Sequence, residues 1–370
     1  MAVHQRKRRP KRGGCFPVAA IAFFCAVGLA MGALGGAGEG ESASSQEPLS
    51  VKPLSQAPAG EDGLQEPSSR EGIPSFREDT LSSQEESAAQ EEEPQPAVPE
   101  GEEAESQGTG QALSLSSEDL YSAAAYLVRR RDGAVLLDIH GTDPIWPASM
   151  TKMMTGYLGA ALLDPEEEVT LPEEIFSTLY AENASLAGFL PGETVTVEEL
   201  LYGTMVPSGA EAAAGIGIAV SGSEEAFVEE MNRAAQELGM DHTHFVNASG
   251  LHHPDHQSTA ADLVLLLDTA LDNSLFRQVF TTHEHLAYGS DHPSGLLLQS
   301  TLWSRIDWEG GEDWTLLGGK TGYTIPAGQC LASLAEKDGE EYILITAGAP
   351  GDGTTAPYHL LDAYTIFSAL

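Results

Sequence analysis

Charge is distributed so unevenly along this 370-residue chain that only one part of it can form a folded domain. Residues 1–14 carry six basic side chains and no acidic one, residues 15–34 carry no charge, and residues 39–110 carry 18 acidic against three basic side chains. The stretch 35–111 is rich in Glu, Ser, Gln, Pro and Gly, so it buries too little apolar surface to offset the chain entropy lost on folding. We therefore expect a disordered linker there and a single folded domain over residues 112–370, which are enough for one large core.

The first 34 residues predict a targeting segment. Positions 15–34 form an uncharged, apolar run that is long enough to span a bilayer, whereas the core of a cleaved signal peptide is usually shorter. The basic residues 1–14 are expected to stay on the cytoplasmic side. We therefore expect a cell-membrane protein with one N-terminal signal anchor and an extracytoplasmic domain. A cleaved signal peptide, which would give a secreted protein, is the alternative.

Apolar residues recur with strand and helix periods along residues 112–370. Two apolar runs around Arg131-Asp132-Gly133, over 123–128 and 134–139, predict a β-hairpin. The same patterns predict a helix after Lys152, helices over 195–202, 210–220, 223–238, 259–271 and 357–370, and strands over 314–324, 329–335 and 342–347. Because helices lie between two sets of strands, we expect an α/β (α+β) fold. One antiparallel sheet would be built from both ends of the domain, with helices packed on it and a helical subdomain.

Ser149 and Lys152 are candidate catalytic residues at the start of a predicted helix. Their spacing of three places both side chains on one face, with Cβ atoms roughly 5–6 Å apart. A serine hydroxyl becomes a good nucleophile only when a base takes its proton. A lysine can be that base if burial or a nearby positive charge lowers its pKa. The S-x-x-K pattern alone occurs often by chance.

A second candidate site lies in the strand predicted over 314–324. Lys320-Thr321-Gly322 offers a positive charge and a hydroxyl to a carboxylate, and its glycine would let a substrate backbone lie along the strand. A phosphate-binding loop is excluded because Trp314 stands where that motif needs its first glycine.

Lysine is scarce in the folded region. Residues 111–370 contain 38 acidic side chains but only three lysines, Lys152, Lys320 and Lys337. Two of the three lie in the two motifs, which favours a shared function over chance.

Taken together, the motifs resemble those of a known family. S-x-x-K at 149–152, Pro207-Ser208-Gly209 and Lys320-Thr321-Gly322 occur in the order typical of penicillin-binding proteins and class A β-lactamases. With Phe-Val-Asn-Ala-Ser-Gly-Leu at 245–251 and Ser-Thr-Ala-Ala-Asp at 258–262, the chain resembles the serine D-Ala-D-Ala carboxypeptidases of peptidase family S11. The resemblance covers about 112–370 and implies a β-lactamase/transpeptidase-like fold.

The resemblance implies a reaction. Such an enzyme removes the terminal D-alanine from peptidoglycan stem pentapeptides through an acyl-enzyme. Ser149 would attack, Lys152 would act as its base, and Ser208 would relay a proton toward the leaving D-alanine. No cofactor and no metal is implied, and β-lactams would acylate Ser149 as inhibitors.

The resemblance also implies a substrate-binding strand. Lys320 and Thr321 would hold the terminal carboxylate of the peptide, beside Gly322. The backbone N–H groups of Ser149 and Tyr323 would form an oxyanion hole, in which a single donor is typically worth about 10²–10³ in rate.

One position departs from the family pattern. The middle motif normally ends in Asn, but here it reads Ser208-Gly209-Ala210, so that Glu211 or a water would have to replace the missing amide. A non-catalytic, cell-wall-binding homologue therefore stays open as an alternative. A β-lactamase is a weaker one, because no clear Glu-x-x-Leu-Asn segment holds a water for deacylation. Endopeptidase action on cross-links is not distinguished.

Other classes of function find little support. An excess of 38 acidic over nine basic side chains in residues 111–370 argues against nucleic-acid binding. The histidines at 242, 244, 252, 253 and 256 lack the helical H-E-x-x-H spacing of zinc peptidases, so we expect them to be loop and surface residues. The single cysteine of the folded region, Cys330, is expected to be a small buried apolar residue.

Overall fold

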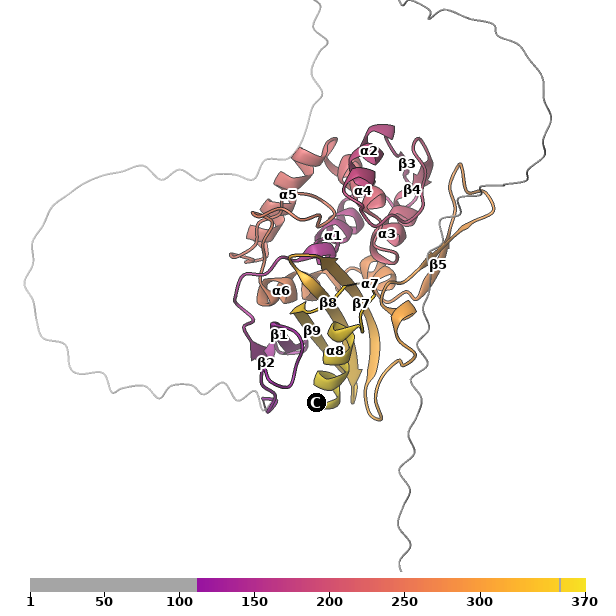
Figure 1. Ribbon diagram of the computed structural model, residues 1–370. Coiled ribbons are helices and arrows are strands. Elements are labelled where there is room, and N and C mark those ends of the chain that lie inside the picture. The colour runs from indigo at the N-terminus through magenta and orange to yellow at the C-terminus, as the bar shows by residue number, and fades with distance from the viewer. Residues whose placement is uncertain (1–111, 353) are drawn as a thin grey trace, which may run out of the picture. The chain divides into compact units, whose positions relative to one another are not determined.

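The folded region is built around one five-stranded antiparallel sheet. The computed structural model describes residues 112–352 and 354–370 (Figure 1), and the basic segment, anchor and linker predicted over residues 1–111 lie outside them. The strands are β1 (Ala124–Arg129), β2 (Ala134–Ile139), β7 (Thr315–Thr324), β8 (Gly328–Lys337) and β9 (Glu340–Ala349), in the order β2-β1-β9-β8-β7. Because β1 lies against β9, the predicted sheet made from both ends of the domain is confirmed.

Tight turns with left-handed residues join the hairpins. Gly133 has a φ of +67° in the β1–β2 turn, and Asp338 and Gly339 have φ of +55° and +77° between β8 and β9. Two consecutive positive φ angles match the twist of antiparallel strands, which is why Asp-Gly favours such turns. Both turns lie where the sequence predicts them.

Helices cover both faces of the sheet. The predicted helices are α1 (Lys152–Leu162), α3 (Val197–Met205), α4 (Ala210–Ser221), α5 (Glu224–Glu237), α6 (Ala260–Ala270) and α8 (Tyr358–Ser368). Along β9, Ile343 and Ile345 join the core beneath α1, α3, α4 and α6, whereas Leu344 joins the core beneath α8 (Figure 1). The period-two alternation of the strand thus separates two apolar cores.

The helix ends lie at residues that cap the free backbone groups or that adopt the left-handed conformation. Thr259 accepts a hydrogen bond from the Asp262 N–H at the start of α6, as expected of an N-cap, and α5 ends just before the left-handed Gly239. The helix predicted over 195–202 begins two residues later, because Val195 pairs with Val169 in a short strand.

Several short elements are not predicted by the sequence patterns. They are η1 (Ala148–Thr151), β3 (Glu168–Thr170), α2 (Glu173–Ala181), β4 (Thr194–Thr196), α7 (Ser274–Phe280), β5 (Glu284–Ala287), β6 (Leu296–Gln299) and η2 (Trp303–Arg305). Within residues 112–352 and 354–370, the helices all lack the combined length and apolar composition needed to cross a bilayer.

His256 lies in the core rather than on the surface, so that part of the histidine prediction is wrong. Its side chain is 2% exposed. The Val246 N–H donates to Nδ1 (3.2 Å), and Nε2 lies 2.8 Å from the hydroxyl of Thr151, which stands between Ser149 and Lys152. Burial lowers the pKa of His256 to about 3, with a smaller contribution from neighbouring histidines. A neutral imidazole is thus built into the support of the η1–α1 junction.

This burial predicts that acid destabilises the protein through His256. The folded-state pKa lies below the ordinary value of 6.5, so the stabilisation is complete above about pH 6.5 and is lost as the pH falls toward 3. At pH 5 we expect the wild type to lose about 2 kcal/mol through this residue. Urea unfolding of wild type and His256→Gln at pH 7.5 and pH 5 measures this loss, and the exposed His253→Gln is the control. Equal acid sensitivity of wild type and His256→Gln would contradict the prediction.

Candidate active site

Ser149 and Lys152 meet where η1 runs into α1. The Lys152 ammonium nitrogen Nζ donates to Ser149 Oγ (3.2 Å) and to the carbonyl oxygen of Ser249 (2.6 Å). The loop that carries Ser249 packs so closely that a Cβ at Gly250 would lie 1.9 Å from the Ala148 oxygen, and Gly250 has a φ of +81°. Only glycine fits there, which accounts for part of the 245–251 segment that the resemblance singled out.

Burial makes Lys152 a base. Its side chain is 2% exposed, and desolvation lowers its pKa to about 7, while the negative charge of Glu211 acts in the opposite direction. Near neutral pH, much of the amine is therefore unprotonated and can accept the Ser149 proton. Ser149 and Lys152, the predicted nucleophile and base, thus lie within hydrogen-bond distance of each other.

A second buried lysine reaches the same place from the sheet. Lys320 in β7 is fully buried, and its Nζ donates to Ser208 Oγ (2.9 Å) and to the Thr321 carbonyl oxygen (2.8 Å). Desolvation lowers the pKa of Lys320 well below its ordinary value, and the charge of Lys152 lowers it further. Ser208 itself has a φ of +69°, an unusual backbone conformation for serine. Three segments distant in sequence thus converge on two hydroxyls and two amines.

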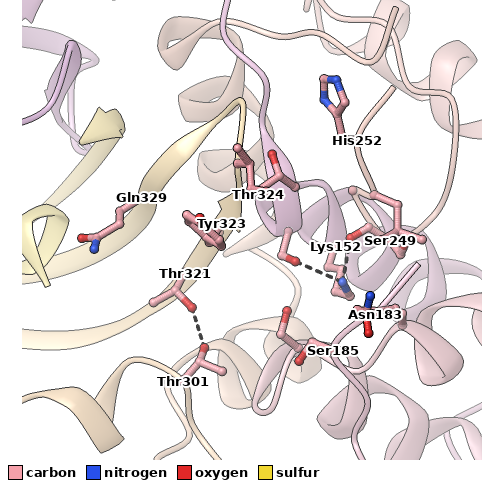
Figure 2. Close-up of a pocket in the computed structure, with 18 of the residues that line it drawn as sticks. Lys152, Asn183, Ser185, Ser249, His252, Thr301, Thr321, Tyr323, Thr324 and Gln329 are labelled. Atoms are coloured by element: carbon pink, nitrogen blue, oxygen red, sulfur yellow. Dashed lines mark hydrogen bonds between the residues drawn. The ribbon is translucent and has the colours of Figure 1, made fainter. Parts of the chain in front are cut away.

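These groups face a cavity of about 800 Å³. Of the residues proposed from sequence, the lining includes Ser149, Lys152, Ser208, Thr321, Gly322 and Tyr323. Figure 2 labels Lys152, Thr321 and Tyr323 among them. Lys320 is not among the lining residues, and its Nζ lies behind the Ser208 hydroxyl to which it donates.

Gly322 brings the edge of β7 against η1. A Cβ at Gly322 would lie 3.2 Å from the Ser149 backbone nitrogen and 3.2 Å from the Pro147 oxygen. The strand can therefore approach the serine closely only without a side chain here. Ser149 and Tyr323, the residues whose backbone N–H groups are expected to form the oxyanion hole, both line the cavity.

Several lining residues were not identified from sequence. Asn183, Ser185, Thr301 and Arg305 also line the cavity, and the hydroxyls of Thr301 and Thr321 lie 2.6 Å apart. They belong to the loop after α2 and to the segment around η2, neither of which was assigned a motif. The scarcity of basic residues was the one signal that could have drawn attention to Arg305.

Position 210 has no polar side chain to offer. Ala210 is 1% exposed, and its N–H donates to the Ser185 oxygen (2.8 Å). Glu211 does not line the cavity, because its Oε1 accepts from the N–H groups of Ala187 (2.7 Å) and Gly188 (2.8 Å). Of the two substitutes that the sequence left open, Glu211 is therefore engaged elsewhere.

Two other candidate chemistries receive no support. Cys330 is fully buried, and desolvation raises the pKa of its thiol to about 11, which keeps it unreactive. Within the described part of the chain, no group of three or more His, Cys, Asp or Glu side chains is arranged to hold a metal ion.

Comparisons with known proteins agree with this geometry. The family model described as D-alanyl-D-alanine carboxypeptidase, Peptidase S11, matches residues 111–351. A D-alanyl-D-alanine carboxypeptidase DacF of Bacillus subtilis is 35% identical over 231 residues, which are 61% of this chain and 57% of the relative. A D-alanyl-D-alanine carboxypeptidase of a Streptomyces species is 27% identical over 70% of this chain and 91% of its own length. The chain thus spans little more than half of the Bacillus relative.

A solved structure shares the fold. A Streptomyces DD-transpeptidase superposes with a TM-score of 0.60 at 27% identity and covers 68% of this chain and 97% of its own. The sheet with helices on both faces is therefore a β-lactamase/transpeptidase-like fold, as expected.

The buried amine predicts the pH dependence of Ser149 acylation. Because the pKa of Lys152 is about 7, we expect the rate to rise with pH and to level off above neutrality. At pH 6 it should lie about tenfold below the plateau. In Glu211→Gln the rise should move to lower pH, because a negative charge that favours the ammonium is lost. Stopped-flow acylation by a fluorescent penicillin measures both profiles, and overlapping profiles would exclude this influence of Glu211.

Proposed function

Because the chain belongs to the D-alanyl-D-alanine carboxypeptidase family of serine peptidases, S11, we propose that it removes the terminal D-alanine from peptidoglycan stem peptides. One observation carries the proposal. Ser149 Oγ accepts from the buried Lys152, and Ser208 Oγ accepts from the buried Lys320, on the wall of one cavity. This arrangement supplies a nucleophile, a base and a proton donor for acyl transfer.

The acylation step follows from these hydrogen bonds. The unprotonated Lys152 amine takes the Ser149 proton while Oγ attacks the carbonyl carbon between the two D-alanines. Ser208 accepts a hydrogen bond from Lys320, so its own proton points away from that amine and can pass to the leaving nitrogen. As the C–N bond breaks and D-alanine leaves, the proton held by Lys152 passes to Ser208 Oγ, which restores both the Ser208 hydroxyl and the neutral Lys152 amine. Water then attacks the ester while Lys152 takes its proton, and that proton passes to Ser149 Oγ as the shortened peptide leaves with a free carboxylate.

The terminal carboxylate of the peptide is received by groups that face the cavity. Thr321 offers a hydroxyl, and Arg305 offers a guanidinium that is anchored by its donation to the Thr355 oxygen (3.0 Å). Because a cationic donor at this place binds a free carboxylate, it would favour cleavage at the end of a peptide over cleavage within it.

The two alternatives raised by the sequence differ in their kinetics. A wall-binding homologue without activity has no need for two buried lysines aligned on two hydroxyls. A β-lactamase releases its penicilloyl group rapidly, whereas the proposed enzyme releases it slowly.

Three measurements test the proposed reaction. The wild type should release D-alanine from a pentapeptide ending in D-Ala-D-Ala and gain one penicillin mass, whereas Ser149→Ala should do neither. A peptide with an amidated end should be a poorer substrate for the wild type, and Arg305→Met should lose most of that discrimination. The absence of both D-alanine release and a covalent adduct in the wild type would exclude the proposal, and rapid loss of the adduct would favour a β-lactamase.

We also propose that residues 15–34 anchor the enzyme in the cell membrane, with residues 35–111 as the tether and the catalytic domain outside the cytoplasm. The charge pattern of residues 1–34 and the location of the proposed substrate support this. Protease added to intact cells should degrade the catalytic domain of the full chain but spare that of a variant lacking residues 1–34. Resistance of the full chain, with degradation only after lysis, would count against the proposed topology.

A further inference from the structure

The cavity wall beside Ser208 lacks the carboxamide that residue 210 would carry. Ala210 contributes only a buried methyl group, and Glu211 is held by backbone N–H groups outside the cavity. We propose that Asn183, from the loop after α2, supplies this carboxamide and binds the peptide backbone of the substrate. The inference deepens the proposed peptidase function and rests on it.

The loop that carries Asn183 is fastened directly to the Ser208 motif. The Ala210 N–H donates to the Ser185 oxygen (2.8 Å), and the Ser185 hydroxyl donates to the Pro207 oxygen (3.2 Å). Close packing reinforces these bonds, since a Cβ at Gly209 would lie 2.7 Å from the Ala187 Cβ. These contacts fasten Ser185, two residues after the exposed Asn183, to the segment that carries Ser208.

The asparagines of the described chain divide into two kinds. The side chains of Asn232, Asn247 and Asn273 each hydrogen-bond to backbone groups and hold local structure together. The Asn183 carboxamide makes no hydrogen bond to another described residue, and it lines the cavity. Figure 2 shows it on the wall that also carries Lys152 and Ser185. It is the one asparagine of these four whose donors and acceptor remain open to a ligand.

The backbone at Asn183 is left-handed, with a φ of +50°. The residue follows the end of α2, where Asn183 and Ala184 donate to the oxygens of Tyr180 and Leu179. Asparagine is among the few residues with a side chain that tolerate this conformation, which is otherwise left to glycine. Glycine would end the helix equally well, so the helix end alone does not explain an asparagine here.

A peptide substrate offers hydrogen-bond partners for the Asn183 carboxamide. An extended peptide that pairs with the edge of β7 presents alternate peptide groups to the strand and the intervening ones to the opposite wall. A carboxamide carries both a donor and an acceptor, so it can bind the C=O and the N–H of such a peptide group.

The first test distinguishes a role of the Asn183 carboxamide in binding substrate from a role of Asn183 in ending α2. Asn183→Gly keeps a residue suited to the left-handed conformation but removes the side chain. We expect an unchanged thermal midpoint and a loss of about tenfold to a hundredfold in kcat/KM for D-alanine release. Asp338→Gly, which replaces another left-handed residue in the distant β8–β9 turn, is the matched control and should retain wild-type kcat/KM.

A second substitution tests whether a carboxamide at position 210 can replace the one at position 183. In Asn183→Gly with Ala210→Asn, the carboxamide returns from the neighbouring position, and we expect recovery to within a few-fold of the wild type. Wild-type kcat/KM in Asn183→Gly overturns the inference, and so does a loss that Ala210→Asn leaves uncorrected. An inactive wild type would instead refute the proposed peptidase function, so the two failures are distinguishable.

Discussion

The rest of this site depends on the burial of two lysine amines close to each other. Lys152 and Lys320 are almost completely buried, and their hydrogen-bond partners are serine hydroxyls and backbone carbonyl oxygens rather than carboxylates. Desolvation penalises the charged form of each, and the charge of Lys152 lowers the pKa of Lys320 further. Much of the Lys152 amine is therefore neutral beside a hydroxyl near pH 7, in a domain that is poor in lysine and rich in acidic residues.

Unfavourable backbone conformations are concentrated where these amines meet. The non-glycine residues with positive φ include Ala148, Asn183 and Ser208, which lie next to the nucleophile, on the cavity wall and at the proton donor. Such conformations cost free energy and persist because the surrounding contacts impose them. At Ala148 the close approach of Gly250 is one such contact, and at Ser208 the hydrogen bond from Lys320 is another.

Features of this protein that depend on local sequence could be predicted, whereas features that depend on contacts between distant segments could not. The hairpins, α6 with its Thr259 cap and the end of α5 at Gly239 were predicted because local sequence determines them. The motif lysines could be predicted because their residue types are rare in this chain. Asn183 and Arg305 could not, because only the packing of an unassigned loop or short helix brings them to the cavity. His256 was misjudged because a polar side chain can be buried when a distant segment, here Thr151, supplies its partner.

The strand order determines how late in synthesis and folding the candidate site can form. Tyr126 in β1 pairs with Ile345 in β9, and the separation of these two residues is more than half the length of the 370-residue chain. The sheet can therefore close only after β9 has been made. Pairings of such long sequence separation form slowly. Lys320 can reach Ser208 only on a strand held by β8 and β9, so a nascent or truncated chain carries the serine without its full set of partners. The three parts of the candidate site therefore come together only late in folding, after the last strands of the sheet have been made.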